Sequence, residues 1–252
     1  MEKRIIFFLL SVVTSVTHLS AQSESGLIMG LEAETKLNRQ VGIGLEADYR
    51  SRNDFKTTDR WSIGLNADYK LSKWLKADAG YSFLRTNFRE KVTTSGTKTK
   101  WRPNYWGPRH RFHASLAADY KVWSNLRLSL RERWQYTYRP EENVDRWKID
   151  ETLKTKILDS DYVRSGKGKH QLRSRVQVEW DKKRALFTPY ANVEFYNSMA
   201  IEKIRYTVGT DIRLTKYHSA SLYYRFQDMK NVDEDDYDPN MHYFGVGYKL
   251  KF

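Results

Sequence analysis

From Leu27 onward, apolar and polar side chains alternate with a period of two residues. Between Val41 and Arg50, for example, Val, Ile, Leu, Ala and Tyr occupy the odd positions, whereas Gly, Glu, Asp and Arg occupy the even ones. Successive side chains of a β-strand point to opposite faces, so this period predicts strands with one apolar and one polar face. Segments of this kind recur at about 27–34, 41–50, 61–71, 75–85, 109–122, 126–138, 170–180, 186–196, 203–214, 218–227 and 241–252.

The connections between these segments are of two kinds. Some are short turns, as at 70–73 and 181–184, and the others are long and polar, at 86–108, 139–169 and 228–240. Short turns on one side and long loops on the other are typical of outer-membrane barrels. We therefore predict an all-β fold, a transmembrane antiparallel up-and-down β-barrel over residues 22–252.

The number of strands is predicted to be about 12, within a range of 10–12, because single-chain bacterial barrels usually have an even count. Segment 147–157 alternates well enough to supply a twelfth strand. With eleven strands, the first strand would begin outside the cell if the last one ends in the periplasm. A twelfth strand at 147–157 would instead place the 86–108 loop in the periplasm, so the register stays open.

The first 21 residues have the three zones of a secretory signal peptide. Charged residues at 2–4 precede an apolar run at 5–13, and Ser20-Ala21 offers a small-residue cleavage site. The apolar run is too short to span a bilayer. We expect export to the bacterial outer membrane and a mature chain that begins near Gln22; a buried N-terminal helix is the alternative.

The end of the chain is an alternating strand whose apolar set finishes in an aromatic residue. Its last members, Tyr248, Leu250 and Phe252, resemble the C-terminal sorting signal that the outer-membrane assembly machinery reads. We therefore expect that machinery as a partner during biogenesis, and outer-membrane lipid and lipopolysaccharide as the surroundings of a monomer. A soluble β-sandwich is the competing interpretation.

Composition removes several classes of protein. The chain has no cysteine, which excludes disulfides, thiolate metal sites and the lipid-modified Cys of a lipoprotein. A mean hydropathy of −0.76 does not argue against a barrel, since only every second residue of a strand meets lipid. The 44 Lys and Arg against 31 Asp and Glu alternate with apolar residues, so the bases point into the barrel and no nucleic acid partner is expected.

The polar positions of the alternating segments are expected to face the lumen, and many of them are charged. The early strands contribute acids and the later strands contribute mainly arginines. The predicted lumen-facing residues are Glu32, Glu34, Glu46, Asp48, Asp68, Asp78, Arg109, Arg111, Arg127, Arg131, Arg133, Arg173, Arg175, Glu194, Arg205, Arg213 and Arg225. Two interpretations stay open: ion pairs that fill a narrow lumen, or a water-filled lumen whose field concentrates anions.

Candidate chemistry is sparse. The five histidines that follow the predicted signal peptide are scattered over four of the predicted strands, and neither G-x-S-x-G nor H-E-x-x-H occurs, so we expect no catalytic residues, no metal and no cofactor. His110, His218 and His242 have the outward parity near strand ends, which favours interfacial anchoring. The acidic run at 233–238 lacks the D-x-D-x-D-G spacing of a calcium loop and is interpreted as a solvated loop.

Several short strings carry a family resemblance. Residues 171–175 (QLRSR), 188–194 (TPYANVE) and the hairpin of 206–209 (YTVG) with 222–225 (LYYR) resemble the outer-membrane family known as domain of unknown function 2490, common in Bacteroidota. The resemblance implies an outer-membrane location and no enzymatic activity, and it names no substrate. We expect Arg173, Arg175 and Glu194 to pair in a lumenal ion network.

Three functions follow from these expectations. The first is a narrow, mildly anion-selective passive channel. The second is a non-conducting structural barrel that presents its long loops to partners. The third is a lipid-modifying enzyme embedded in the membrane, which no motif supports.

Overall fold

The computed structural model describes residues 23–150, 155–159, 162–182, 185–230 and 238–252. The predicted signal peptide and residues 233–237 of the acidic run lie outside the described residues. No helix in the described ranges is long and apolar enough to cross a membrane.

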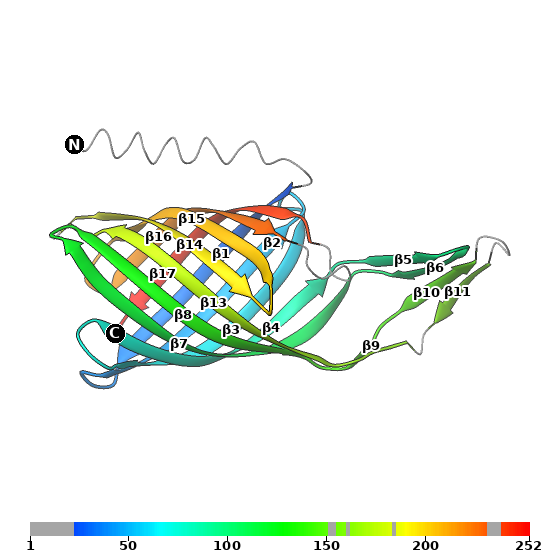
Figure 1. Cartoon of the computed structure of the whole chain (residues 1–252), viewed down its shortest axis with the longest axis horizontal. Coiled ribbons are helices and arrows are strands. Elements are labelled where there is room, and N and C mark those ends of the chain that lie inside the picture. Colours follow the sequence, from blue (N-terminus) through cyan, green and yellow to red (C-terminus); the bar gives the residue numbers. More distant parts are fainter. Residues whose placement is uncertain (1–22, 151–154, 160–161, 183–184, 231–237) are drawn as a thin grey trace.

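Among the described residues, eleven strands close into a β-barrel (Figure 1). Each of the eleven segments with two-residue alternation corresponds to one strand of the wall. The strands are β1 (Ser23–Lys36), β2 (Val41–Arg52), β3 (Thr57–Lys70), β4 (Leu75–Phe88), β7 (Tyr105–Trp123), β8 (Leu126–Arg139), β13 (Lys167–Trp180), β14 (Phe187–Asn197), β15 (Ile201–Arg213), β16 (His218–Met229) and β17 (Asn240–Lys251).

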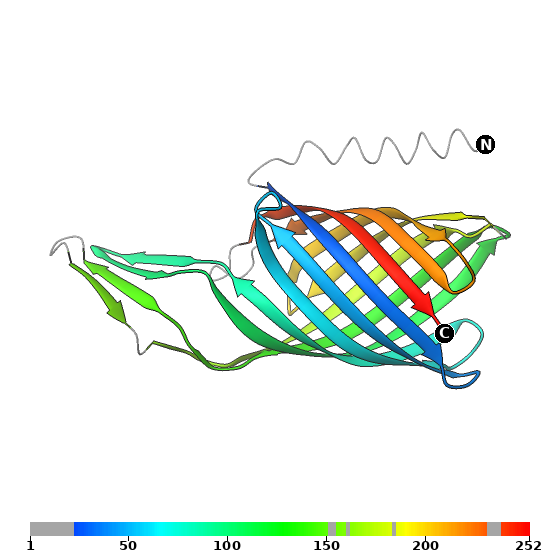
Figure 2. The same cartoon turned by 180° about the vertical axis from the view of Figure 1, so that it is seen from behind.

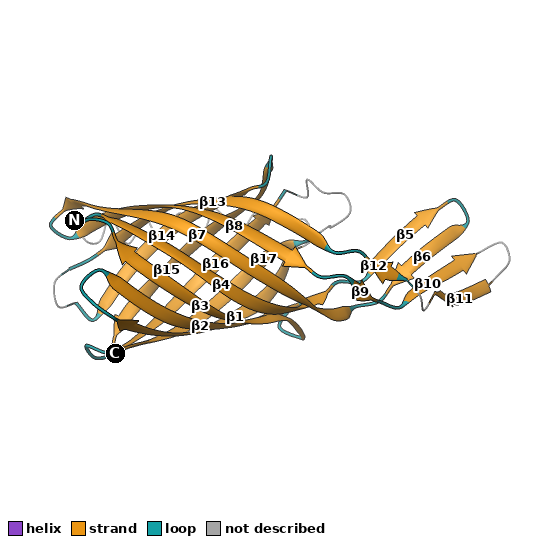
Figure 3. Cartoon of the chain, turned by 90° about the horizontal axis from the view of Figure 1, so that it is seen from below, coloured by secondary structure: helices purple, strands orange, loops and turns teal. Residues whose placement is uncertain are grey.

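Eleven wall strands fall within the predicted range of 10–12, but the suggested twelfth strand is not part of the wall. The candidate twelfth segment, 147–157, contributes instead to β10 (Arg146–Asp150) and β11 (Thr155–Asp159), which pair with each other outside the barrel. With β5 (Lys91–Ser95) and β6 (Lys98–Arg102) they form a separate four-stranded sheet in the order β11-β10-β6-β5. This sheet projects from one end of the barrel (Figure 3). Because β10 bonds to β6 and β11, its backbone groups are satisfied without joining the wall.

The odd number of strands determines how the barrel closes. Neighbouring strands are antiparallel except for β1 and β17, which pair in parallel from Ser23 beside Asn240 to Glu34 beside Lys251. Figure 2 shows these two strands, blue and red, side by side. An up-and-down barrel with an odd count must contain one such pair, so β1 begins at the end of the barrel opposite to the one where β17 finishes.

The two ends of the barrel differ in their connections. At one end, here called the C-terminal rim, β17 finishes and the turns 37–40, 71–74, 124–125, 181–186 and 214–217 connect the strands. The other end, here called the loop rim, carries the start of β1 and the links 53–56, 89–104, 140–166, 198–200 and 230–239. Both of the longest links, and the sheet that they form, therefore lie at the loop rim.

Contacts around Phe88 tie the 140–166 link to the wall. Phe88 is buried and stacks on Tyr105 with ring centroids 4.9 Å apart. Arg164 lies in β12 (Val163–Arg164), which pairs with β9 (Glu142–Asn143). Its guanidinium carbon is 4.5 Å from the centroid of Phe88, and Nη1 donates to Tyr105 Oη. This cation–π and hydrogen-bond contact fixes the base of the projecting sheet against the barrel.

The outer face of the wall is apolar. Leu45, Leu65, Leu116 and Leu130 keep between 47% and 56% of their side-chain surface exposed there. Tyrosine and histidine pair on this face: Tyr81 Oη lies 2.8 Å from His110 Nδ1, and similar pairs join His218 to Tyr248 and His242 to Tyr224, each at 2.6 Å. An exterior of exposed leucines edged with amphipathic aromatic residues suits lipid contact better than water.

One charged residue interrupts this apolar face. Glu132 is exposed in the middle of β8, in register with Leu116 and Ser174. Ser174 Oγ donates to Glu132 Oε2 at 2.6 Å. The carboxylate lies beside an outer hollow of about 630 Å³ that is otherwise lined largely by Ala, Leu and aromatic side chains, including Ala114 and Trp134. The arginines on either side of it in the sequence, at 131 and 133, point into the lumen.

Candidate functional site in the barrel lumen

The cross-strand register places all the predicted charged residues on the face that lines the lumen. Directly opposed residues of neighbouring strands share a face. One ladder of opposed residues runs from Asp68 through Asp78, Ser115 and Arg133 to Arg173. A second ladder reads Arg131, Arg175, Glu194, Arg205 and Gln227. The structure divides the charged residues into groups with different partners.

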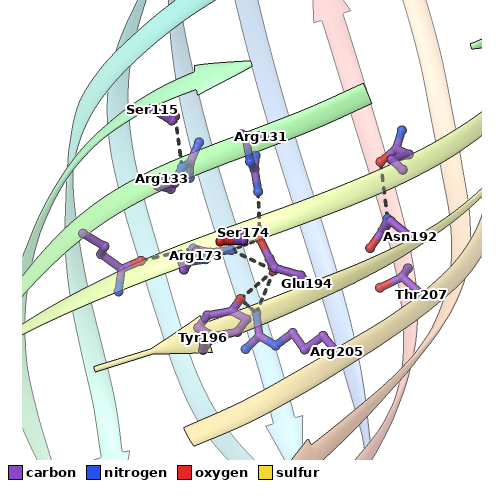
Figure 4. Close-up of polar contacts among 12 residues, drawn as sticks. Ser115, Arg131, Arg133, Arg173, Ser174, Asn192, Glu194, Tyr196, Arg205 and Thr207 are labelled. Carbon is purple, nitrogen blue, oxygen red and sulfur yellow. Dashed lines mark hydrogen bonds and ion pairs between the residues drawn. The ribbon is translucent and has the colours of Figure 1, made fainter. Parts of the chain in front are cut away.

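Glu194 is the centre of the largest group, here called the Glu194 network. Only 6% of this residue is exposed. Arg131 Nη2 donates to Oε1 at 2.9 Å, and Arg173 Nη2 donates to both carboxylate oxygens at 2.9 and 3.1 Å. Arg205 Nη1 lies 4.0 Å from Oε2. Figure 4 shows these side chains converging on Glu194 from β8, β13 and β15.

Tyr196 completes the Glu194 network. Its hydroxyl donates to Glu194 Oε2 at 2.8 Å and accepts a hydrogen bond from Arg205 Nη1. Its ring has three cations around it, with Arg173 Cζ, Lys203 Nζ and Arg205 Cζ at 4.6, 4.6 and 4.5 Å from the centroid. The ring and the carboxylate together compensate buried positive charge that would otherwise be costly.

A second group, here called the Asp78 network, adjoins the first. Ser115 Oγ donates to Asp78 Oδ1 at 2.5 Å, while His113 Nε2 and Arg133 Nη2 lie 3.2 and 3.3 Å from Oδ2. Arg133 follows Arg131 by two residues on β8, so both point to the lumen and connect the two networks. Together the networks bind β4, β7, β8, β13, β14 and β15 to one another, which are six consecutive strands of the wall.

Side chains from the opposite wall reach toward these networks. Glu46 lies on β2, five strands away from β13 around the ring, yet its charge acts on Arg173 and on Arg133. Glu46 accepts a hydrogen bond from Ser82 Oγ at 3.1 Å. This bond passes over Gly64, where a Cβ would lie 2.8 Å from both Glu46 Oε1 and Ser82 Oγ. The middle of the lumen is therefore narrowed by side chains from both sides.

Two arginines were expected to pair with Glu194, and the structure shows an ion pair for Arg173 but none for Arg175 among the described residues. Arg175 nevertheless lies directly opposite Glu194 in the register. The carboxylate is held instead by Arg131 and Arg173, and Arg175 Nε is buried without an acceptor in the described structure. An arginine side chain is long enough to bond diagonally, so opposition in the register does not decide which arginine pairs.

Several predicted residues lie toward the C-terminal rim in short-range pairs. Lys249 Nζ lies 3.0 Å from Glu32 Oε2 and also pairs with Glu34. Arg127 pairs with Glu179 and Asp181. Lys76 pairs with Asp68 at 3.2 Å. Away from this rim, Arg225 lies opposite Tyr243, and its Nε donates to Thr207 Oγ1 at 3.1 Å. In the register, Asp48 lies opposite Gly30 and Ser62, and Arg213 lies opposite Ser219. In the described structure neither residue forms an ion pair that would make it part of a site.

Toward the loop rim the lumen widens into a cavity of about 570 Å³, here called the vestibule. Among the described residues, four acids line it, Asp59, Glu90, Glu202 and Asp238. Thirteen bases line it as well: Arg50, Arg52, Arg60, Arg89, Lys91, Arg102, Arg109, Arg111, Arg139, Lys167, Lys169, Lys203 and Arg205. The predicted residues Arg109, Arg111 and Arg205 thus belong to a strongly basic chamber.

The acids of the vestibule are already engaged. Asp59 pairs with Arg52 at 3.3 Å, and Asp238 pairs with Arg89 at 3.4 Å. Glu202 pairs with Lys169 and accepts a hydrogen bond from Gln171 Nε2 at 2.6 Å. Glu90 accepts from Trp101 Nε1 at 3.2 Å.

Four vestibule cations have no such partner. Among the described residues, no carboxylate lies within 4.0 Å of the charged groups of Arg50, Arg60, Arg111 or Lys203. Arg111 Nε donates only to Thr137 Oγ1 at 3.4 Å, and the charges of Arg60 and Arg50 act on it repulsively.

Sequence reasoning omitted five of these functional residues. Arg50 and Arg60 have the lumen parity of their strands, so extending the alternation to the strand ends would have found them. Lys203, Tyr196 and His113 also have the lumen parity, but a search restricted to carboxylates and arginines passes over them. Within the described ranges, no group of three or more His, Asp or Glu is arranged to hold a metal ion.

A family model described as "Protein of unknown function (DUF2490)" matches residues 26–250. The chain belongs to this family. No curated protein matches the chain.

Two solved structures are similar to this member of the DUF2490 family. The translocator domain of autotransporter NalP from Neisseria meningitidis aligns with a TM-score of 0.46 and 10% sequence identity, over 91% of each chain. The CymD monoaromatic hydrocarbon channel aligns with a TM-score of 0.35 and 8% identity, over 85% of this chain and 86% of that one.

Proposed function

We propose that this chain is an outer-membrane β-barrel that acts as a narrow, mildly anion-selective passive channel. The outer-membrane assignment is supported by the apolar exterior and by the closed wall, because a closed barrel leaves no unpaired strand edge in lipid. We place the loop rim on the outer side of the membrane and the C-terminal rim in the periplasm. In this orientation the vestibule opens toward the exterior of the cell.

The observation that carries the selectivity is the imbalance of charge in the vestibule. Thirteen bases against four acids make an entrance whose field concentrates anions and repels cations. The Glu194 and Asp78 networks then narrow the lumen, so only small solutes would pass. Selectivity would be mild because Glu194 and Asp78 offset part of the arginine charge further along the path.

The second candidate function is a non-conducting structural or surface-interaction barrel. It is favoured by the two networks, which fasten six consecutive strands together, and by the four-stranded sheet that projects from the loop rim. In this alternative the barrel is a scaffold and the projecting sheet meets a partner.

We propose further that the barrel works as a monomer in lipid and lipopolysaccharide, is inserted by the outer-membrane assembly machinery, and is not an enzyme. The apolar hollow beside Glu132 and Ser174 carries no histidine among its lining residues, so it lacks the base that a Ser hydrolase requires. Turnover of phospholipid or lipid A by the purified barrel in detergent would contradict the non-enzymatic assignment.

Planar-bilayer recording tests the channel directly. With a KCl gradient across the bilayer, the sign of the zero-current potential reports whether Cl⁻ or K⁺ passes more easily. We expect small, stable conductance steps and a potential of the sign that Cl⁻ passage gives. The absence of steps at any voltage would favour the structural barrel, and a cation-selective potential would contradict the role assigned to the vestibule.

A further inference from the structure

The four cations of the vestibule that lack a carboxylate partner define a site of their own. We propose that Arg50, Arg60, Arg111 and Lys203 bind a small soluble solute that carries two or more anionic oxygens, of the phosphate, phosphate-ester or polycarboxylate class. This inference goes beyond the proposed channel, since such a site would exist whether or not the barrel conducts.

The first argument is the cost of burying these cations without a carboxylate in direct contact. Only 8% of Arg50 is exposed, and Nε of both Arg50 and Arg60 is buried without an acceptor in the described structure. The charges of Asp48 and Asp59 act on these arginines from a distance. A buried cation gains much more from a counter-charge that also accepts its hydrogen bonds. A bound anion would supply such acceptors.

The second argument comes from the contrast with arginines of the same lumen that bind a carboxylate directly. Glu194 draws in Arg131 and Arg173, and Asp78 draws in Arg133. The vestibule provides no equivalent carboxylate for Arg50 or Arg60. A ligand that carries carboxylate or phosphate oxygens would accept hydrogen bonds from these arginines, as Glu194 does from Arg131 and Arg173 in the middle of the lumen.

The nature of the donors selects the ligand. Guanidinium groups offer fixed forks of N–H donors that match the paired oxygens of phosphate and carboxylate, whereas a chloride ion uses one donor at a time. Several cations converge on one cavity, so a multivalent anion gains more than a monovalent one. The site faces the lumen, which lipid headgroups outside the wall do not enter, and this favours a soluble ligand.

The cavity also limits the size and polarity of the ligand. A volume of about 570 Å³ is within the range of small-molecule sites in proteins. Met241 and Tyr243 line one side of the vestibule and belong, with Ile28, to a buried apolar cluster. A compact organic body that bears anionic groups fits such a chamber better than an extended polymer does.

The test uses the full barrel, refolded in detergent, with sodium pyrophosphate as the probe. Its thermal unfolding is followed by heat-modifiable migration on gels, with sodium chloride at equal ionic strength and glucose as reference solutes. We expect pyrophosphate to raise the unfolding temperature in a saturable way that neither reference reproduces. Titration calorimetry then gives the dissociation constant for the same probe.

Substitution separates a built site from general screening of charge. Arg60→Gln and Arg111→Gln should each weaken pyrophosphate binding by about tenfold to a hundredfold, as expected when a charge-assisted hydrogen bond is lost. Arg225→Gln makes the same change of charge at a lumen arginine outside the vestibule and should leave binding within about twofold. Far-UV circular dichroism and heat-modifiable migration show that each variant is folded.

The outcomes are distinct from those of the conductance experiment. An equal response to chloride and pyrophosphate at matched ionic strength, or an equal loss of affinity in Arg225→Gln, would overturn the site. Saturable binding without any conductance would support the site and overturn the channel. Anion-selective conductance without saturable binding would support the channel and overturn the site.

Discussion

The Glu194 network and the vestibule are neighbouring parts of one lumen, and they use arginine in different ways. In the network, Arg131 and Arg173 converge on a carboxylate that is 6% exposed. In the vestibule, Arg50 and Arg60 meet like charges and no described carboxylate within 4.0 Å. The comparison shows that arginines of one lumen differ in their partners, and we infer that the partner decides whether such an arginine supports the fold or is available to a ligand. Each of the following substitutions tests one side of this comparison.

The largest effect is expected at Glu194. Replacing it with alanine would leave Arg131, Arg173 and Arg205 buried without their shared counter-charge, which costs about 3–5 kcal/mol of unfolding free energy when one partner of a buried pair is removed. Urea unfolding in detergent micelles measures this loss. Glu34→Ala is the matched control, because Glu34 faces the lumen but its side chain is 40% exposed beside Lys249. The control should lose less than about 1 kcal/mol, and equal losses in both variants would remove the structural role of the network.

A smaller effect of opposite sign is expected on the outer face. Glu132 is a charged residue in the middle of an apolar surface, where it accepts a hydrogen bond from Ser174. If this face meets lipid, Glu132→Leu should stabilise the barrel in bilayers by up to about 2 kcal/mol, since a carboxylate at the membrane midplane is unfavourable. Unfolding in lipid vesicles of defined thickness makes the measurement. A loss of stability would instead indicate that Glu132 contacts a partner in the membrane.

The vestibule arginines should respond unlike Glu194. Without ligand, Arg60→Gln removes a buried charge that has no carboxylate partner, so the unfolding free energy should stay the same or rise by about 1 kcal/mol. The same variant should lose pyrophosphate binding. Urea unfolding with and without the probe measures both properties in one protein. A loss of several kcal/mol without ligand would mean that Arg60 supports the fold in the way that Arg131 does.

The smallest effect is expected in the projecting sheet, where ion pairs meet solvent. The hydrogen bonds from Arg146, together with Lys148, hold the pKa of Asp159 below its ordinary value. A lowered pKa means that the pair stabilises the sheet fully above the ordinary pKa of Asp and that this support is lost as the pH falls through the folded pKa. Hydrogen exchange of β10 and β11 should therefore rise in acid relative to Asp159→Asn at the same pH. The difference in exchange rate between the wild-type protein and Asp159→Asn should be small, because exposed pairs are screened. Exchange rates that stay equally far apart as the pH is lowered would contradict the role assigned to Asp159.

Much of this architecture was predictable, because alternation is a local property that each strand carries in its own residues. Two-residue alternation alone also suggested a twelfth wall strand that the described structure does not contain. Segment 147–157 alternates like a wall strand, and only its pairing with β6, which lies more than 40 residues earlier in the chain, keeps it outside the barrel. The two-residue period of a segment does not indicate which distant segment it pairs with.

The candidate site was predictable in its face but not in its partners. Parity placed Glu194, Arg173 and Arg175 together on the lumen side, yet it did not identify Arg131 as a partner, because parity ignores the reach of long side chains. The distinction between paired and unpaired arginines depends on side chains from opposite walls, such as Glu46 and Arg173, and on the length of the links at the rim. Those relations appear only once the wall is closed.

The central claim is that anions collect at the unpaired arginines and avoid the paired ones. Crystals of the barrel grown with selenate, whose anomalous signal locates the ion, test it most directly. The account predicts an anomalous peak among Arg50, Arg60 and Arg111, and none beside Arg131 or Arg173. A vestibule without selenate, or equal peaks at both places, would contradict it.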